Sequence, residues 1–128
     1  MHKLLITLTL FLLLMNMSAC QPQKEPAALV VENYLTAIVN KDAEKISVLS
    51  CAEWVDSAML DLDAFQGVEA RLDGLQCAVT GTEDTFTLVK CQGAILATYN
   101  NEEQKFDLDT RTYLLSQFNG DWLVCGTQ

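Results

Sequence analysis

The spacing of hydrophobic positions changes along this chain, and each change marks a different kind of segment. Apolar residues and threonines run without a break from Leu4 to Leu14. Beyond Pro26, apolar residues recur at every third or fourth position, which is typical of amphipathic helices. From Val68 onward, apolar and polar residues mostly alternate, which is typical of strands. The pattern therefore predicts an apolar leader, a helical part and then a sheet.

Three helices are predicted in the helical part. The first spans residues 27–40 and follows Pro26, which is tolerated at a helix start because the first N–H groups have no partner there. The second is shorter and ends at Leu49. Asp42 is its expected N-cap, because a carboxylate at that position accepts from free N–H groups of the first turn. The third spans residues 52–64. Each has an apolar stripe that another layer must cover.

Four β segments are predicted, at residues 68–80, 85–99, 104–118 and 121–126, joined as an antiparallel meander. Short loops rich in asparagine, aspartate and glycine fix its register. Across Asn119-Gly120, Phe118 is expected to pair with Asp121 and Leu114 with Cys125. Across a turn at Asn100-Asn101, or one residue later, Cys91 is expected to pair with Thr110 or Thr112. Across an odd-length loop around residues 82–85, Cys77 is expected to pair with Cys91. This register leaves one face of the sheet without charge, so we expect the helices to cover that face.

The chain begins with the features of an export signal. His2 and Lys3 give a positive start, the apolar run follows, and Met17-Ser18-Ala19 precedes Cys20. The apolar run is too short to cross a bilayer, which takes roughly 20 helical residues. Residues 17–20 resemble the lipobox of bacterial lipoproteins, although that motif usually has leucine where this chain has Met17. The resemblance implies cleavage after residue 19, lipidation of Cys20 and attachment to the extracytoplasmic side of a bacterial cell membrane. The alternative is an ordinary secretory signal that leaves Cys20 as a free thiol.

Three segments follow from this interpretation: a signal peptide at residues 1–19, a lipidated cysteine with a tether at residues 20–26, and one domain at residues 27–128. Loss of Lys3 leaves 7 of the 8 basic side chains against 17 acidic ones, so the net charge of the exported chain is about −10. Such a charge repels nucleic acid and anionic lipid head groups. We therefore expect no nucleic-acid partner, and contact with the membrane only through the lipid anchor.

Four cysteines remain if Cys20 carries the lipid, and an even number suits two disulfides in an exported domain. Neighbouring strands lie about 4.8 Å apart. Cys91 and Cys125, two strands apart, would therefore be about 10 Å from each other, and Cys77 and Cys125 farther still. Both distances exceed the roughly 7 Å limit for bridged Cα atoms. The pairs that remain are Cys77 with Cys91 and Cys51 with Cys125. The alternative is that one pair stays reduced and buried. No Cys-x-x-Cys spacing occurs, so a redox role is not expected.

Residues 30–37 and 40–45, followed by the meander, resemble the NTF2-like superfamily. The similarity covers residues 27–127 and is greatest with small exported lipoproteins that carry such a cystatin-like domain. Their cysteines match those of this chain, including the terminal Trp122-x-x-Cys125-Gly126. The resemblance implies an α+β fold with two or three N-terminal helices on the concave face of a curved four-stranded sheet, often around a pocket. The superfamily includes isomerases, dehydratases and transport factors, so membership alone does not decide function.

An isomerase or dehydratase would need a general base and a hydrogen-bond donor facing such a pocket. The only histidine, His2, would leave with the signal peptide. Asp107, Asp109 and Arg111 form the most obvious charged cluster, but alternation places them on the face away from the helices. We therefore expect a domain that is not an enzyme and that holds no cofactor and no metal. The acidic run of the third helix lacks the glycine and terminal glutamate of a calcium loop and is expected to be a solvated face: Asp56, Asp61 and Asp63.

Two binding hypotheses remain, and the first is favoured. One is self-association or a protein partner at an apolar patch on the otherwise polar face of the last two strands, the face through which related domains often dimerise. The other is a small apolar ligand held between helices and sheet, where a filled core would use the same residues. The patch residues are Tyr113, Leu115, Trp122 and Val124, and the pocket residues are Tyr34, Ile38, Val55, Ile95, Tyr99, Phe106 and Leu108.

Overall fold

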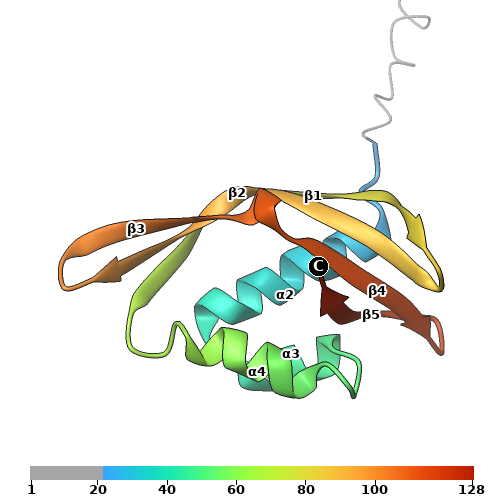
Figure 1. Cartoon of the computed structure of the whole chain (residues 1–128), viewed down its shortest axis with the longest axis horizontal. Helices are drawn as coiled ribbons and strands as arrows, with labels where there is room; N and C mark the ends of the chain where they lie inside the picture. Colours follow the sequence, from blue (N-terminus) through green and yellow to red (C-terminus); the bar gives the residue numbers. More distant parts are fainter. Residues whose placement is uncertain (1–21) are drawn as a thin grey trace, which may run out of the picture.

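Within residues 22–128, three helices lie on one face of a curved, antiparallel sheet of five strands (Figure 1). The computed structural model describes residues 22–128, so the predicted signal peptide and Cys20 lie outside the described residues. Within residues 22–128, no helix has the length and apolar character needed to cross a membrane. The elements are α2 (Pro26–Asn40), α3 (Ala43–Leu49), α4 (Val55–Asp63), β1 (Glu69–Glu83), β2 (Phe86–Tyr99), β3 (Glu102–Asp107), the 3-10 helix η2 (Leu108–Thr110), β4 (Thr112–Phe118) and β5 (Asp121–Thr127). The predicted α+β class is confirmed.

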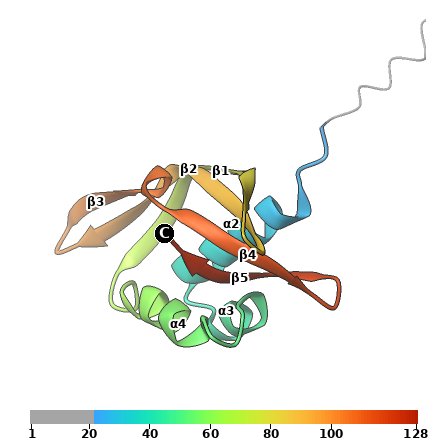
Figure 2. The same ribbon diagram turned by 45° about the vertical axis from the view of Figure 1, so that its right-hand side comes forward.

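The helices α2 and α3 begin and end where the sequence places helix signals, whereas α4 begins three residues later than the helix predicted at residues 52–64. Pro26 opens α2, and Lys41 closes it in the left-handed conformation, with a φ of 59°. The N–H of Asp42 donates to the carbonyl oxygen of Ala37 at 2.9 Å, which satisfies one of the last carbonyls of the helix. The Asp42 side chain then accepts from the N–H of Lys45 at 3.0 Å, so the predicted N-cap of α3 is confirmed. Figures 1 and 2 show α2 directly against the sheet, with α3 and α4 below it.

The long strand β2 organises the sheet. β1 pairs with one edge of β2 along nearly its whole length. On the other edge, β4 pairs with residues Thr87 to Lys90, and β3 pairs with residues Ala94 to Tyr99. β5 follows beyond β4. The single segment predicted at residues 104–118 is therefore two strands separated by η2, which is why the sheet has five strands instead of four.

The 3-10 helix η2 changes which face β4 presents to the helices. Ala94 pairs with Asp107 before η2, and Lys90 pairs with Thr112 after it. Four steps along β2 thus correspond to five steps on its neighbour, and a shift of one residue moves every following side chain to the other face. Tyr113 therefore points into the core and is 2% exposed. The predicted register contained no such break, so its face assignment for β4 is wrong.

The first hairpin places Cys77 opposite Cys91, as predicted. Its loop is a two-residue turn at positions 84–85 instead of an odd-length loop, and an extra residue between Val79 and Gly81 restores the same register. Of the other predicted pairs, Phe118 with Asp121 is confirmed. Leu114 pairs with Gly126 instead of Cys125, because a bulge lies beside it. Thr112 pairs with Lys90 instead of Cys91.

The cysteines lie in the two predicted pairs. Cys77 and Cys91 join β1 to β2, with their Cα atoms 4.0 Å apart. Cys51 and Cys125 join the loop after α3 to β5, with their Cα atoms 4.8 Å apart. The N–H of Cys51 also donates to the carbonyl oxygen of Val124 at 2.8 Å, so the helical layer and the last strand are connected at this point by backbone as well as by sulfur.

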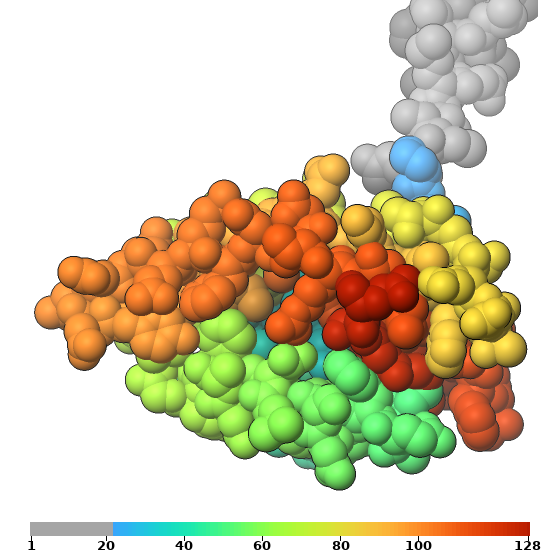
Figure 3. Space-filling view, viewed as in Figure 1, coloured from blue at the N-terminus to red at the C-terminus, as the bar shows by residue number. Residues whose placement is uncertain are grey.

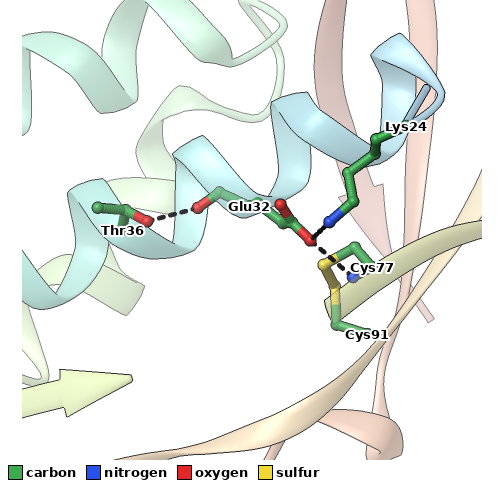
Figure 4. Close-up of a disulfide and its surroundings, with 5 residues drawn as sticks. All are labelled: Lys24, Glu32, Thr36, Cys77 and Cys91. Carbon is green, nitrogen blue, oxygen red and sulfur yellow. Dashed lines mark hydrogen bonds and ion pairs between the residues drawn. A yellow bond between two sulfur atoms is a disulfide. The ribbon is translucent and has the colours of Figure 1, made fainter. Parts of the chain in front are cut away.

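A carboxylate on α2 ties this helix to the sheet beside the first disulfide (Figure 4). One Glu32 carboxylate oxygen accepts from the backbone N–H of Cys77 at 2.9 Å and forms an ion pair with the Lys24 ammonium. The Glu32 side chain is only 16% exposed, and hydrogen bonds to a charged acceptor are about twice as strong as neutral ones. This contact fixes the N-terminal half of α2 on β1 and thereby positions its other half, which lines the pocket described next.

Candidate functional site: a pocket between the helices and the sheet

A pocket of about 490 Å³ opens between the C-terminal half of α2, α4 and the strands β2, β3 and β4. Figure 3 shows it as a hollow between the orange strands and the green α4, with teal α2 at its bottom. Sites for small molecules usually measure about 300 to 1,000 Å³. The apolar walls come from Leu35, Ile38, Phe65, Ile95, Phe106 and Leu108.

Five of the seven predicted pocket residues line this pocket: Tyr34, Ile38, Ile95, Phe106 and Leu108. Val55 does not, because it is the first residue of α4 and the second half of that helix borders the pocket. Tyr99 lies outside because it ends β2, and its ring contacts Phe106 with centroids 6.5 Å apart. Phe65, which was not predicted, packs on Phe106 edge to face at 5.9 Å and closes one wall.

Two tyrosine rings meet at the buried side of the pocket. The rings of Tyr34 on α2 and Tyr113 on β4 pack edge to face with centroids 6.2 Å apart. The indole N–H of Trp54 donates to the Tyr34 hydroxyl oxygen at 3.3 Å. Burial raises the pKa of the Tyr34 hydroxyl, and it raises the pKa of Tyr113 to about 12. Both groups are therefore protonated near neutral pH and can donate hydrogen bonds.

The Tyr113 hydroxyl has no hydrogen-bond partner among the described residues. Every enclosed polar side-chain atom in this part of the chain does have a partner. The Tyr113 hydroxyl must therefore touch accessible space even though the residue is 2% exposed. Since Tyr113 lines the pocket, this space is the pocket itself. A buried polar group that opens only into a cavity is a point at which a ligand can be recognised.

Two ion pairs stand at the mouth of the pocket. Arg111, between η2 and β4, lies 3.3 Å from the Asp61 carboxylate on α4, and Lys105 lies 2.8 Å from Asp107 on β3. All four side chains are at least 31% exposed, so each pair contributes little to stability. Arg111 and Asp107 were expected on the face away from the helices, and Asp61 on a solvated helix face, but all three line the pocket. Asp61 and Asp107 both stand at the mouth, and Asp107 also lines a second hollow with Gln92 and Asp109.

The predicted apolar patch on the outer sheet face does not exist, because the shift at η2 turns these residues inward. Tyr113, Leu115 and Val124 are at most 2% exposed, and Trp122 is partly buried against the core. A protein partner or a second copy of the chain could not reach the three buried side chains. Among them, Tyr113 belongs to the pocket.

Asp61 could have been found from the sequence. It lies three residues after Ala58, so helical spacing places both on one side of α4, and Phe65 follows shortly after the end of the helix. Ala58 is buried and Phe65 lines the pocket. A carboxylate within the apolar stripe of a helix indicates a pocket or an ion pair, whereas the acidic content of the helix alone suggested a solvated face.

Neither a family model nor a curated protein matches this chain. Solved structures do match. A ketosteroid isomerase-like protein from Shewanella frigidimarina aligns with a TM-score of 0.54 and 13% identity over 80% of this chain and 93% of that one. A SEC-C motif containing protein from Rhodopseudomonas palustris aligns with a TM-score of 0.52 and 14% identity over 81% and 80%.

The domain has an NTF2-like fold. At these identities the likeness shows the arrangement of helices and strands alone. Function has to be argued from the residues of the pocket.

Proposed function

We propose that this NTF2-like domain binds a small, mainly apolar molecule in the pocket without converting it chemically. The observation that carries the proposal is the pocket itself, with a volume of about 490 Å³, apolar walls from three layers of structure and a few polar groups at its base and mouth. Burial of apolar ligand surface contributes roughly 25 cal/mol per Å², which supplies the affinity. The polar groups would set the orientation of the ligand.

Two features support binding without turnover. The sequence of residues 22–128 contains no histidine, the side chain that most often transfers protons near neutral pH. The two carboxylates at the mouth are each paired with a cation, Asp61 with Arg111 and Asp107 with Lys105. A substrate could use either carboxylate as a base only by displacing the cation beside it.

We also propose that the domain works while attached through a lipid on Cys20 to the extracytoplasmic side of a bacterial membrane. The lipobox-like residues before Cys20 support this, as do two cysteine pairs at disulfide distance, because disulfides persist in oxidising compartments. Labelling of cells with a radioactive fatty acid tests it. The chain should carry label, and Cys20→Ala should not. Equal label in both would place the lipid elsewhere, and no label in either would remove the anchor.

Equilibrium dialysis of ethylnaphthalene tests the binding site. The chain is reconstituted in lipid nanodiscs, and empty nanodiscs of the same lipid give the background. Ala64 is exposed and lines the pocket, so Ala64→Trp should fill the space without disturbing the core and weaken binding at least about tenfold. Val48→Trp, at a 68% exposed position on α3 that does not line this pocket, is the matched control. Binding that survives Ala64→Trp would place the site elsewhere.

An isomerase-type reaction is the second candidate, because the Asp61 carboxylate and the Tyr113 hydroxyl line the same pocket. In such a reaction Asp61 would remove a proton next to a carbonyl group, and Tyr113 would donate to the carbonyl oxygen. Exchange of the methyl protons of acetylnaphthalene with deuterated water, followed by NMR, distinguishes the two functions. Exchange that requires the chain and is lost in Asp61→Asn would make the protein an enzyme. No exchange above the rate in buffer is the outcome that binding alone predicts.

A further inference from the structure

We propose that the ligand of this pocket is an uncharged, mainly apolar molecule that carries a hydrogen-bond acceptor, such as a carbonyl oxygen, at the end buried against Tyr113 and Tyr34. The inference rests on the proposed function, because it names the chemistry of the molecule that the pocket would hold. It is carried by the hydrogen-bonding state of the two phenols and by the pairing of the charges at the mouth.

The Tyr113 hydroxyl is the polar group that the protein itself leaves free to meet a ligand. The Tyr113 hydroxyl has no partner among residues 22–128, although 98% of the residue is shielded from solvent. A hydroxyl in this position exchanges its bonds to bulk water for whatever the pocket contains. A purely apolar ligand would expel water from the pocket and leave the hydroxyl without a partner, which weakens the binding of such a ligand. The pocket therefore favours a ligand with a polar atom at this point.

The O–H groups of Tyr34 and Tyr113 decide whether the polar atom of the ligand accepts or donates. The Tyr34 hydroxyl oxygen already accepts from the Trp54 indole N–H, so its O–H is the part left to interact with a ligand. The Tyr113 O–H is also free to donate. A ligand group that only donates, such as an ammonium, could not accept from either O–H, whereas an acceptor oxygen with two lone pairs can accept from both phenols. Two donors on touching rings thus favour an acceptor such as a ketone, ester or amide carbonyl.

The ion pairs at the mouth decide the charge of the ligand. The pocket lining contains two cations, Lys105 and Arg111, and both are paired with the carboxylates of Asp107 and Asp61. An anionic ligand would have to displace a carboxylate from its cation, and the displaced carboxylate would then repel it. Burial of an unpaired charge between apolar walls is also costly. With its charges balanced in pairs, the mouth favours an uncharged molecule.

Three naphthalenes of similar size separate these properties: acetylnaphthalene carries a carbonyl acceptor, ethylnaphthalene replaces it by hydrocarbon, and naphthoate is an anion. Their affinities are measured by equilibrium dialysis against the whole chain in nanodiscs, with empty nanodiscs as background. Tyr113→Phe removes only the hydroxyl and keeps the ring packed on Tyr34, so it should weaken acetylnaphthalene about tenfold. Ethylnaphthalene should bind at least as tightly as before, because no hydroxyl is then left without a partner. Tyr99→Phe, whose ring lies outside the pocket, should change neither.

The outcomes separate failure of this inference from failure of the proposed function. Retained binding of ethylnaphthalene by Tyr113→Phe also shows that the variant is folded. If acetylnaphthalene loses no affinity in Tyr113→Phe while ethylnaphthalene binds, the pocket binds apolar molecules but the inferred acceptor is wrong. If naphthoate binds most tightly and Arg111→Gln abolishes this, the ligand is an anion and the inference is overturned. If none of the three probes binds above background, the proposed function itself fails.

Discussion

At the scale of single residues, Gly93 allows the two longest strands to bend. It adopts a φ of 95°, a left-handed conformation that residues with a side chain rarely adopt. A Cβ at this position would lie 2.4 Å from the carbonyl oxygen of Asp73 and 2.6 Å from the backbone of Gly74. The pairing of β1 with β2 is interrupted here, between Asp73 and Gln76. The bend that curves the sheet over α2 therefore depends on the absence of a side chain at position 93.

We predict that Gly93→Ala destabilises the domain by about 3 kcal/mol, because either the strand contact or the backbone conformation must change. Gly81→Ala is the matched control. Gly81 lies in β1, where it pairs with Leu88 of β2, and nothing lies within 4 Å of a Cβ built at this position. Urea unfolding followed by circular dichroism measures both. A loss of less than about 1 kcal/mol for Gly93→Ala would mean that the strands can bend without this glycine.

At the scale of elements, much of the fold could be predicted because its signals are local. The three helices, the N-cap at Asp42 and the hairpin pairs at Cys77 and Phe118 each depend on residues that are close in sequence. The face of β4 could not be predicted in the same way. It depends on one additional residue taken up by η2, and nothing in the spacing of apolar residues near Leu108 shows that the strand is interrupted there.

The same shift explains what the sequence could show of the site. Residues that line the pocket from α2 and β2, such as Tyr34, Ile38 and Ile95, lie in segments whose register was predicted correctly. Tyr113 and Arg111 follow η2 and were assigned to the wrong face. The apolar walls of the pocket were thus mostly foreseeable, whereas the phenol and the charges that would set its specificity were not.

The two disulfides close loops of different length, and we predict that they stabilise the domain unequally. In the chain-entropy model the bond between Cys51 and Cys125, at a sequence separation of 74, contributes about 4 kcal/mol. The bond between Cys77 and Cys91, at a separation of 14, contributes about 3 kcal/mol.

Two variants, each retaining one disulfide, are compared in their oxidised and reduced states, so that side-chain packing is the same within each comparison. One variant carries Cys77→Ala and Cys91→Ala, and the other carries Cys51→Ala and Cys125→Ala. Reduction should lower the free energy of unfolding more in the first variant than in the second. The opposite order would show that the shorter bond stabilises by a means other than restricting the unfolded chain.

At the scale of the whole molecule, the tether and the pocket lie at different ends of α2. Residues 22–25 precede the helix, and Lys24 is held by Glu32 near β1. The pocket residues Leu35 and Ile38 lie roughly 15 Å along the helix axis from Pro26, the first residue of α2, at a rise of about 1.5 Å per residue. Figure 1 shows residues 22–25 leaving the domain beside β1, away from the end where β3 extends. The proposed anchor would therefore hold the domain without covering the pocket.

Burial of the two pocket phenols links the stability of the whole molecule to alkaline pH. The pKa of Tyr113 is raised from 10.0 to about 12, mainly by burial, and the pKa of Tyr34 is raised for the same reason. Because the protonated phenol is favoured in the folded state, this stabilisation is complete below pH 10 and is lost as the pH rises from 10 through 12.

We expect the free energy of unfolding of the wild type to fall across this range. Tyr113→Phe should show a smaller fall, because one of the two groups no longer titrates. Urea unfolding at stepped pH, with tyrosinate absorbance recorded at each step, measures this difference. Equal falls in both proteins would mean that the Tyr113 hydroxyl ionises in the folded state as easily as in the unfolded chain.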